Sequence, residues 1–161
     1  MVQNNEWGPP LWMILHICVE NCGRQPSAIL HTDEVRAWIQ LLHLVEAILP
    51  CPLCQKHYRD WLRMHPPKRF LDKRNPTGFY EAAQKWLWDL HDKINEQRGV
   101  ERMSLEEAKE LYSTKTTADL QRALERLLEV LERAKLQRLI DGIHAREWRQ
   151  KLALLRGFLK I

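Results

Sequence analysis

The chain has 161 residues, of which 45% are hydrophobic and 29% are charged, a composition typical of one globular domain with a single core. No apolar run is long enough to cross a membrane, and the N-terminal residues MVQNNEWGPP lack the basic and apolar regions of a secretory signal. Residues 113–161 carry 11 Lys and Arg but 6 Asp and Glu, a net charge of +5, whereas residues 1–112 carry −1, which gives +4 for the whole chain. The basic character therefore gives no ground for predicting nucleic-acid binding.

Apolar residues recur at helical spacing along the whole chain, and no alternating strand pattern competes, so we predict an all-α fold. Pro9 and Pro10 suit the first turn of a helix, Asp33 is a candidate N-cap for the second helix, and Ser104 with Glu107 forms a capping box. The expected helices of the main domain have approximate bounds of 9–22, 33–49, 51–64, 77–97 and 104–112.

The last fifty residues have a separate helical pattern. Their apolar seam predicts two further helices, with Leu120, Leu124, Leu127, Leu131 and Ala134 in the first and Trp148, Leu152, Leu155 and Leu159 in the second. We therefore divide the chain into a domain at 1–112 and a basic, amphipathic helical extension at 113–161. We expect this extension to pack on the bundle or to extend a dimer contact, with binding to an anionic membrane or a partner protein as the alternative.

A pair of cysteines with two residues between them is the chemical centre of the sequence. Cys51 follows a proline and opens a helix, where unpaired backbone N–H groups favour the thiolate, and the spacing lets Cys51 and Cys54 form a disulfide. A zinc site would need two further ligands, of which only His57 is in place, and a thioredoxin motif needs flanking strands. Two unrelated buried thiols are the remaining alternative. We predict a redox dithiol and no metal.

The order and spacing of three motifs resemble the Erv/ALR family of FAD-dependent sulfhydryl oxidases, and most of all its compact virus-encoded members. The resemblance covers about residues 6–112. The matching residues are Gly8, Trp12 and His16 in the first motif, Pro50, Cys51 and Cys54 in the second, and His91 and Asn95 in the third.

This resemblance implies a four-helix bundle that holds FAD at its mouth, with a short fifth helix across it. It also implies that Cys51 exchanges with incoming dithiols and that Cys54 lies next to the flavin, which passes electrons to oxygen as hydrogen peroxide. The residues expected to line the cofactor are Gly8, Trp12, His16, His57, Trp86, His91, Asn95 and Tyr112.

Two positions depart from the family pattern. Asp92 stands where the family commonly has asparagine, and Val100 stands where it commonly has a lysine that would face the phosphates. The first change introduces a charge that is unfavourable near a pyrophosphate. We expect Arg98 or Arg102 to replace the missing cation and FAD to bind, though less tightly.

The remaining cysteines, Cys18 and Cys22, lie on one face of the first helix at a spacing that does not normally permit a disulfide. Free thiols are the favoured interpretation, while a shuttle dithiol after fraying of the helix end and an intersubunit bridge stay open. Trp61 and Trp88 belong to no motif, and we expect them in packing or in a dimer surface.

The predicted partners are protein dithiols or a thioredoxin-like relay protein, molecular oxygen, and a second copy of the chain that pairs through the first two helices, as the resemblance implies. The expected location is the host cytoplasm or the virion, with the mitochondrial intermembrane space as the alternative. A second hypothesis is a redox-inert helical scaffold that keeps the fold and binds partners through its extension, which Asp92 and Val100 favour. A zinc-binding interaction module is a third.

Overall fold

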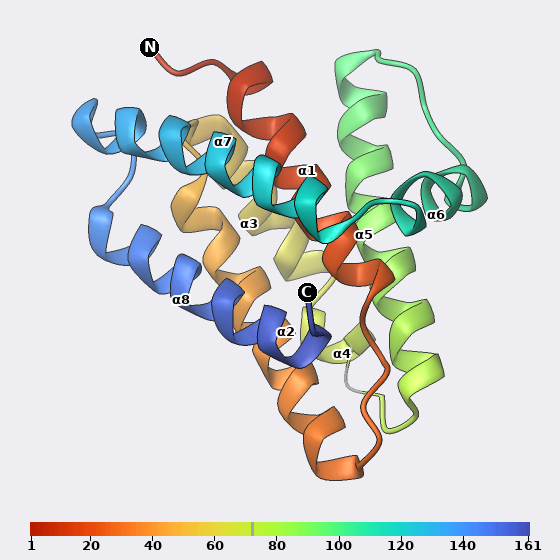
Figure 1. The fold of residues 1–161 in the computed structure, drawn as a ribbon. Coiled ribbons are helices and arrows are strands. Elements are labelled where there is room, and N and C mark those ends of the chain that lie inside the picture. Colours follow the sequence, from red (N-terminus) through yellow and green to blue (C-terminus); the bar gives the residue numbers. More distant parts are fainter. Residues whose placement is uncertain (72) are drawn as a thin grey trace.

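Helices account for all the regular secondary structure in the computed structural model, which describes residues 1–71 and 73–161 (Figure 1). The all-α prediction is confirmed, since these residues contain no strand. No helix among them is long and apolar enough to cross a membrane. The eight helices are α1 (Asn4–Glu20), α2 (Ala28–Ile48), α3 (Pro52–Met64), α4 (Pro67–Leu71), α5 (Pro76–Arg98), α6 (Leu105–Ser113), α7 (Thr117–Leu136) and α8 (Gly142–Leu159).

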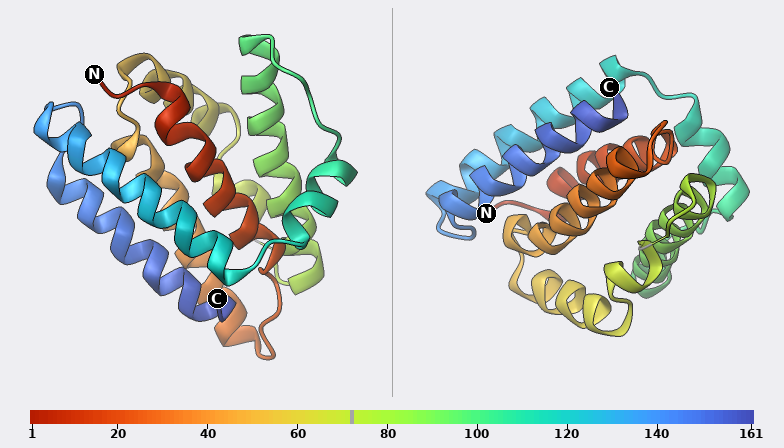
Figure 2. Two further views of the ribbon diagram at one scale, coloured as in Figure 1. Left: turned by 45° about the horizontal axis from the view of Figure 1, so that its top comes forward. Right: turned by 90° about the horizontal axis from the view of Figure 1, so that it is seen from below.

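The helices form three layers, which are clearest when the molecule is seen from below (Figure 2). α1 and α2 make the middle layer. On one side α5 packs on α1 and α3 packs on α2, which completes the expected four-helix bundle. The short helix α6 lies across α1 and α5 as the expected fifth helix. On the other side α7 packs on α1 and α8 packs on α2, so the middle layer is covered on both faces.

Local capping explains two differences between the expected and the observed helices. The expected start of the second helix near Asp33 is wrong, because the Ser27 hydroxyl accepts a hydrogen bond from the Leu30 N–H at 3.2 Å and begins α2 six residues earlier. Two prolines follow His65, where α3 ends. Pro67 also begins α4, since the first turn of a helix tolerates proline.

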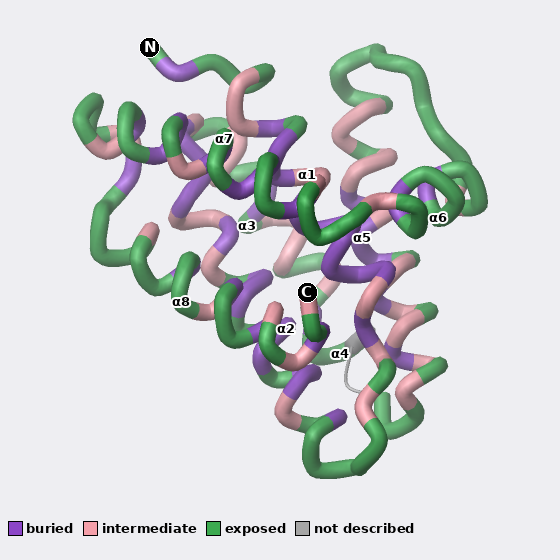
Figure 3. Tube along the Cα trace, in the orientation of Figure 1, coloured by how far each residue is buried: buried purple, intermediate pink, exposed green. Residues whose placement is uncertain are grey.

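The extension formed by α7 and α8 belongs to the same hydrophobic core as the bundle. Its inward-facing residues are buried, and the buried part of the chain is centred on α1 and α2 (Figure 3). Polar contacts also fasten it: the Val2 N–H donates to the Gln137 amide oxygen at 3.1 Å, and Arg133 pairs with Glu6 at 2.6 Å. A homodimer through α1 and α2 is therefore not compatible with this arrangement, and any homodimer must use another face.

The turn after α1 is held close to the start of α5. Gly23 has a φ of 72°, a left-handed conformation that glycine adopts easily, and a Cβ atom there would lie 2.5 Å from the Pro76 carbonyl oxygen. The Gly23 N–H also donates to the buried Glu34 carboxylate at 3.1 Å. This close approach fixes how α1 and α5 sit against each other, and these two helices carry most of the candidate site.

Candidate functional site

The CPLC turn carries a disulfide at the start of α3. Cys51 is the N-cap of the helix, Pro52 is its first residue, and the Cys51 and Cys54 sulfurs are bonded. The Cys54 N–H donates to the Cys51 sulfur at 3.2 Å. This N–H belongs to the first turn of α3 and has no partner within the helix, so the Cys51 sulfur caps the helix as the sequence predicts. Both cysteines are partly exposed and Leu53 between them is 61% exposed, so the disulfide is open to solvent.

A cavity of about 650 Å³ opens beside this disulfide, between the middle layer and the layer of α3 and α5. Both cysteines line it. Four of the eight residues expected to contact the cofactor also line it, and they come from α1, α3 and α5: Gly8, Trp12, His57 and Trp86. Most of the remaining wall is apolar. The structure thus places the redox dithiol at the edge of a cavity with aromatic walls.

Trp61 is a part of this site that the sequence analysis missed. It packs against the core, as we expected, but it also lines the cavity, stacks on His65 with ring centroids 3.6 Å apart, and meets Trp86 edge-on at 6.3 Å. The Trp86 indole N–H donates to the His65 carbonyl at 2.9 Å. The Trp61 indole N–H is buried and has no hydrogen-bond partner in the described chain, so it is a free donor for a ligand. One turn of helix separates Trp61 from His57, and that spacing was the available signal.

Three more expected residues form a stack next to the cavity and do not line it. His91 lies flat against Trp12 with centroids 4.0 Å apart, and His16 lies flat against Tyr112 at 4.2 Å. The two histidines meet through His16 Nε2 and His91 Nδ1 at 3.0 Å, so one ring nitrogen donates and the other accepts. The pair fixes the orientation of Trp12, whose side chain reaches the cavity.

Burial keeps both histidines neutral. Loss of solvation and the neighbouring His91 lower the pKa of His16 from 6.5 to about 3. Loss of solvation lowers the pKa of His91 from 6.5 to about 4, against a smaller opposing effect of Asp92. Both rings are therefore uncharged near neutral pH. Their role in the structure is to stack and to share one hydrogen bond.

Of the two candidate cations, only Arg98 reaches the cavity. Arg102 instead donates from Nε to the Asp92 Oδ1 at 2.9 Å and from its terminal nitrogen to Oδ2 at 2.6 Å. Arg98 lines the cavity together with Lys93 and has no ion-pair partner among the described residues. Asn95, the last expected contact, is partly buried one turn before Arg98 and does not line the cavity.

The second pair of cysteines is buried. Cys18 and Cys22 are free thiols with exposed fractions of 0% and 2%. Burial raises the pKa of Cys18 to about 12, with a small opposing effect of Arg156, and burial is also the main cause of the raised pKa of Cys22. The free-thiol interpretation is confirmed for this structure. A shuttle or an intersubunit bridge would require the end of α1 to open.

Trp88 is the remaining tryptophan without a motif. Its indole N–H donates to the Met103 carbonyl at 2.9 Å and so fastens α5 to the segment that leads into α6. The packing role that we expected for Trp88 fits this contact.

A helical bundle with a solvent-open disulfide at the edge of an aromatic cavity is the class of protein that this geometry defines. Residues 9–113 match the sequence model of the Erv1 / Alr family, and the chain belongs to that family. The match ends before α7, so the α7–α8 extension lies outside the family sequence. Comparison with curated proteins and with solved structures finds no match.

Proposed function

We propose that this protein is an FAD-dependent sulfhydryl oxidase that forms disulfides in protein dithiols. The observation that carries the proposal is the position of the Cys51–Cys54 disulfide, which is exposed to solvent on one side and lines the aromatic cavity on the other. Membership of the Erv1 / Alr family supports the same activity.

The residues around the cavity fit a flat, ring-containing cofactor with phosphates. Broad ring faces come from Trp7, Trp12, Trp61 and Trp86, which all line the cavity. The buried and unpartnered Trp61 N–H supplies a hydrogen-bond donor for a ring carbonyl or nitrogen. Arg98 adds positive charge at the far end of α5, where phosphates would be neutralised, and Lys93, which also pairs with Glu96 at 3.0 Å, lines the cavity nearby. These residues would hold FAD.

The chain's own part in the reaction is thiol–disulfide exchange. A substrate thiolate attacks the Cys51 sulfur, the bond between Cys51 and Cys54 breaks, and Cys54 leaves as a thiolate. The second substrate thiol then attacks the mixed disulfide, which releases Cys51 and leaves the substrate oxidised by two electrons. When bound, FAD would accept these two electrons and deliver them to oxygen, which gives hydrogen peroxide.

The position of each sulfur supports this division of roles. Cys54 lies within the first turn of α3 and packs against the hydrophobic core, whereas Cys51 precedes the helix and its sulfur faces an N–H of the first turn. The thiolate that leaves is thus the one directed toward the interior. The disulfide sulfur that is attacked is that of Cys51, which precedes the helix and is partly exposed, so a protein substrate can approach it.

A visible absorption spectrum of the purified protein before and after addition of dithiothreitol in air tests the proposal. We expect flavin bands that bleach and then recover as peroxide is released, and we expect Cys54→Ser to bind FAD but to lose turnover. Cys18→Ser is the matched control, because this thiol is buried and free, and it should turn over normally. A colourless protein that cannot be loaded with FAD would contradict the enzyme hypothesis.

The alternative of a redox-inert scaffold depended on Asp92 and Val100. In the structure Arg102 forms an ion pair with Asp92, and Arg98 lines the cavity from the same helix. Both departures from the family pattern therefore have a compensating residue nearby, and we favour the oxidase.

A further inference from the structure

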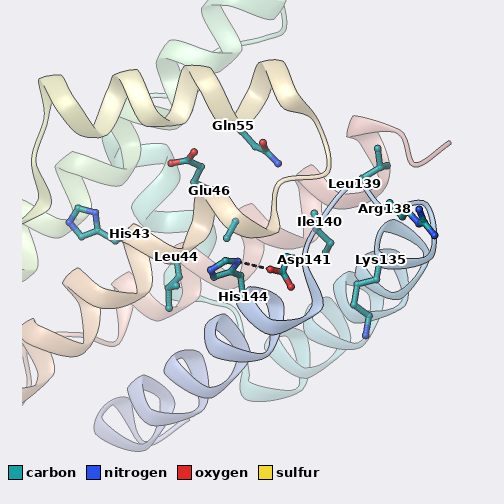
Figure 4. Close-up of a pocket in the computed structure, with 11 residues that line it drawn as sticks. His43, Leu44, Glu46, Gln55, Lys135, Arg138, Leu139, Ile140, Asp141 and His144 are labelled. Atoms are coloured by element: carbon teal, nitrogen blue, oxygen red, sulfur yellow. Dashed lines mark ion pairs between the residues drawn. The ribbon is translucent and has the colours of Figure 1, made fainter.

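A second cavity, of about 630 Å³, lies on another side of the first turn of α3 and shares no lining residue with the first. It lies between α2, α3 and the loop that joins α7 to α8 (Figure 4). The bundle contributes Glu46 and Gln55 among other residues, and the extension contributes Arg138, Leu139 and His144. Half of this cavity is thus built by residues outside the family sequence.

The cavity borders the turn that carries the disulfide through one residue. Gln55 follows Cys54 directly in the sequence and lines the cavity. Its side-chain amide donates to the Leu49 carbonyl at 2.7 Å. This hydrogen bond joins the two ends of the segment from Leu49 to Gln55, which contains both cysteines. A polypeptide held in this cavity would lie against the same loop that presents the Cys51 sulfur.

The walls are partly apolar and leave one cation unpaired. Leu44, Ala47, Leu139 and Ile140 supply the apolar surface. Arg138 is exposed and has no ion-pair partner among the described residues. Most of the other titratable groups already have partners: His144 with Asp141 at 3.2 Å, Lys135 with Glu132 at 2.7 Å, and Glu46 with Arg59.

The backbone at Arg138 adopts an uncommon conformation. It has a φ of 57°, a left-handed conformation, at the end of α7, where the Leu139 N–H bonds back to the Ala134 carbonyl at 2.9 Å. Glycine or asparagine is the usual residue at this position of a helix end, because other side chains are strained there. Lys160 at the end of α8 has a similar φ of 58°, so the connection of Arg138 with binding rests on its unpaired charge in the cavity.

We propose that this cavity is the docking site for the dithiol-bearing segment of the protein substrate, and that Arg138 selects segments with a carboxylate beside the cysteines. The inference rests on the proposed oxidase function. The apolar wall takes an apolar side chain of the same segment, and the guanidinium pairs with the carboxylate. The specificity for protein substrates is therefore a property of the α7–α8 extension, while the exchange chemistry belongs to the bundle.

Steady-state oxidation of three reduced substrates by the FAD-loaded full chain tests this proposal. Two are synthetic peptides that contain a Cys-x-x-Cys pair, one flanked by aspartates and the other by lysines, and the third is dithiothreitol. We expect kcat/KM for the acidic peptide to exceed that for the basic peptide by about tenfold. Arg138→Asp should reverse this preference, Arg138→Asn should abolish it, and Arg149→Glu, an exposed control on α8, should keep it.

Asparagine and aspartate tolerate the left-handed conformation, so these variants should fold, and an unchanged rate with dithiothreitol would establish that they do. Equal kcat/KM values for both peptides in the wild type and in Arg138→Asp would overturn the docking site. So would oxidation of dithiothreitol without oxidation of either peptide. Failure of the wild type with dithiothreitol itself would instead refute the oxidase function, so the two failures can be distinguished.

Discussion

Arg102 and Asp92 form a two-point ion pair that ties the segment after α5 back onto that helix, with N–O distances of 2.9 and 2.6 Å. The Asp92 side chain is only 13% exposed and lies next to His91 in the sequence. The guanidinium hydrogen-bonds to the Asp92 carboxylate and lowers its pKa, so the carboxylate stays ionised but its charge is compensated.

Removal of Arg102 should therefore weaken FAD binding. In Arg102→Ala the Asp92 charge is uncompensated near the site, and we expect the Kd for FAD to rise about three- to tenfold. Asp92→Asn combined with Arg102→Ala should restore the affinity, because the charge is then absent. Flavin fluorescence titration gives the Kd values. Lys85→Ala, which breaks a comparable pair with Asp89 on the outer face of α5, is the control and should have no effect.

Arg98 should contribute directly to the binding of the phosphates. It lines the cavity and has no ion-pair partner among the described residues, so Arg98→Glu should raise the Kd for FAD by about tenfold. The loss should shrink as salt is added, since an exposed charge is screened. Arg126→Glu, on α7 in the layer away from the cavity, should bind FAD normally. Equal affinities for the two variants would show that Arg98 does not face the phosphates.

The buried histidine pair should make the protein less stable in acid. His16 and His91 have folded-state pKa values of about 3 and about 4, both below the ordinary 6.5, so below pH 6.5 the unfolded chain binds more protons than the folded one. Their contribution is complete above pH 6.5 and is lost as the pH falls toward those folded-state values. Each histidine reduces the free energy of unfolding by at most about 1.4 kcal/mol per pH unit in that window.

Urea denaturation between about pH 8 and pH 4 measures this slope. His16→Gln removes one of the two titrating groups and should flatten the dependence. The raised pKa of the buried Glu34 acts in the opposite direction, but it is common to both proteins and cancels in the comparison. Identical slopes for wild type and variant would mean that the histidine pair titrates normally.

The α7–α8 extension should behave as part of the core rather than as an appendage. Leu152 on α8 is 1% exposed, and Leu152→Ala should lower the free energy of unfolding by about 2–5 kcal/mol. Leu154 lies two residues further along the same helix and is 48% exposed, so Leu154→Ala should cost less than about 0.5 kcal/mol. Chemical denaturation measures both. A small cost for Leu152→Ala would show that the extension is loosely attached.

The family membership and most of the helices follow from the sequence because their signals are local. Helical periodicity, the Ser104–Glu107 capping box and the proline before Cys51 act within a turn or two of the chain. The motifs around Trp12, Cys54 and His91 could also be recognised by spacing alone. The expected start of α2 at Asp33 was wrong by six residues, because Ser27, which the sequence analysis did not consider, is an equally good cap residue.

Only the tertiary structure determined the contacts between residues that are far apart in the chain. The sequence offered Arg98 and Arg102 as equal candidates, and packing assigned one to the cavity and the other to Asp92. Trp61 belonged to no motif until α3 and α5 brought it against Trp86. Likewise, the apolar seam of α7 and α8 predicts that these helices are buried on one side. Only the folded chain shows that this side covers α1 and α2, because a hydrophobic face is not specific for its partner.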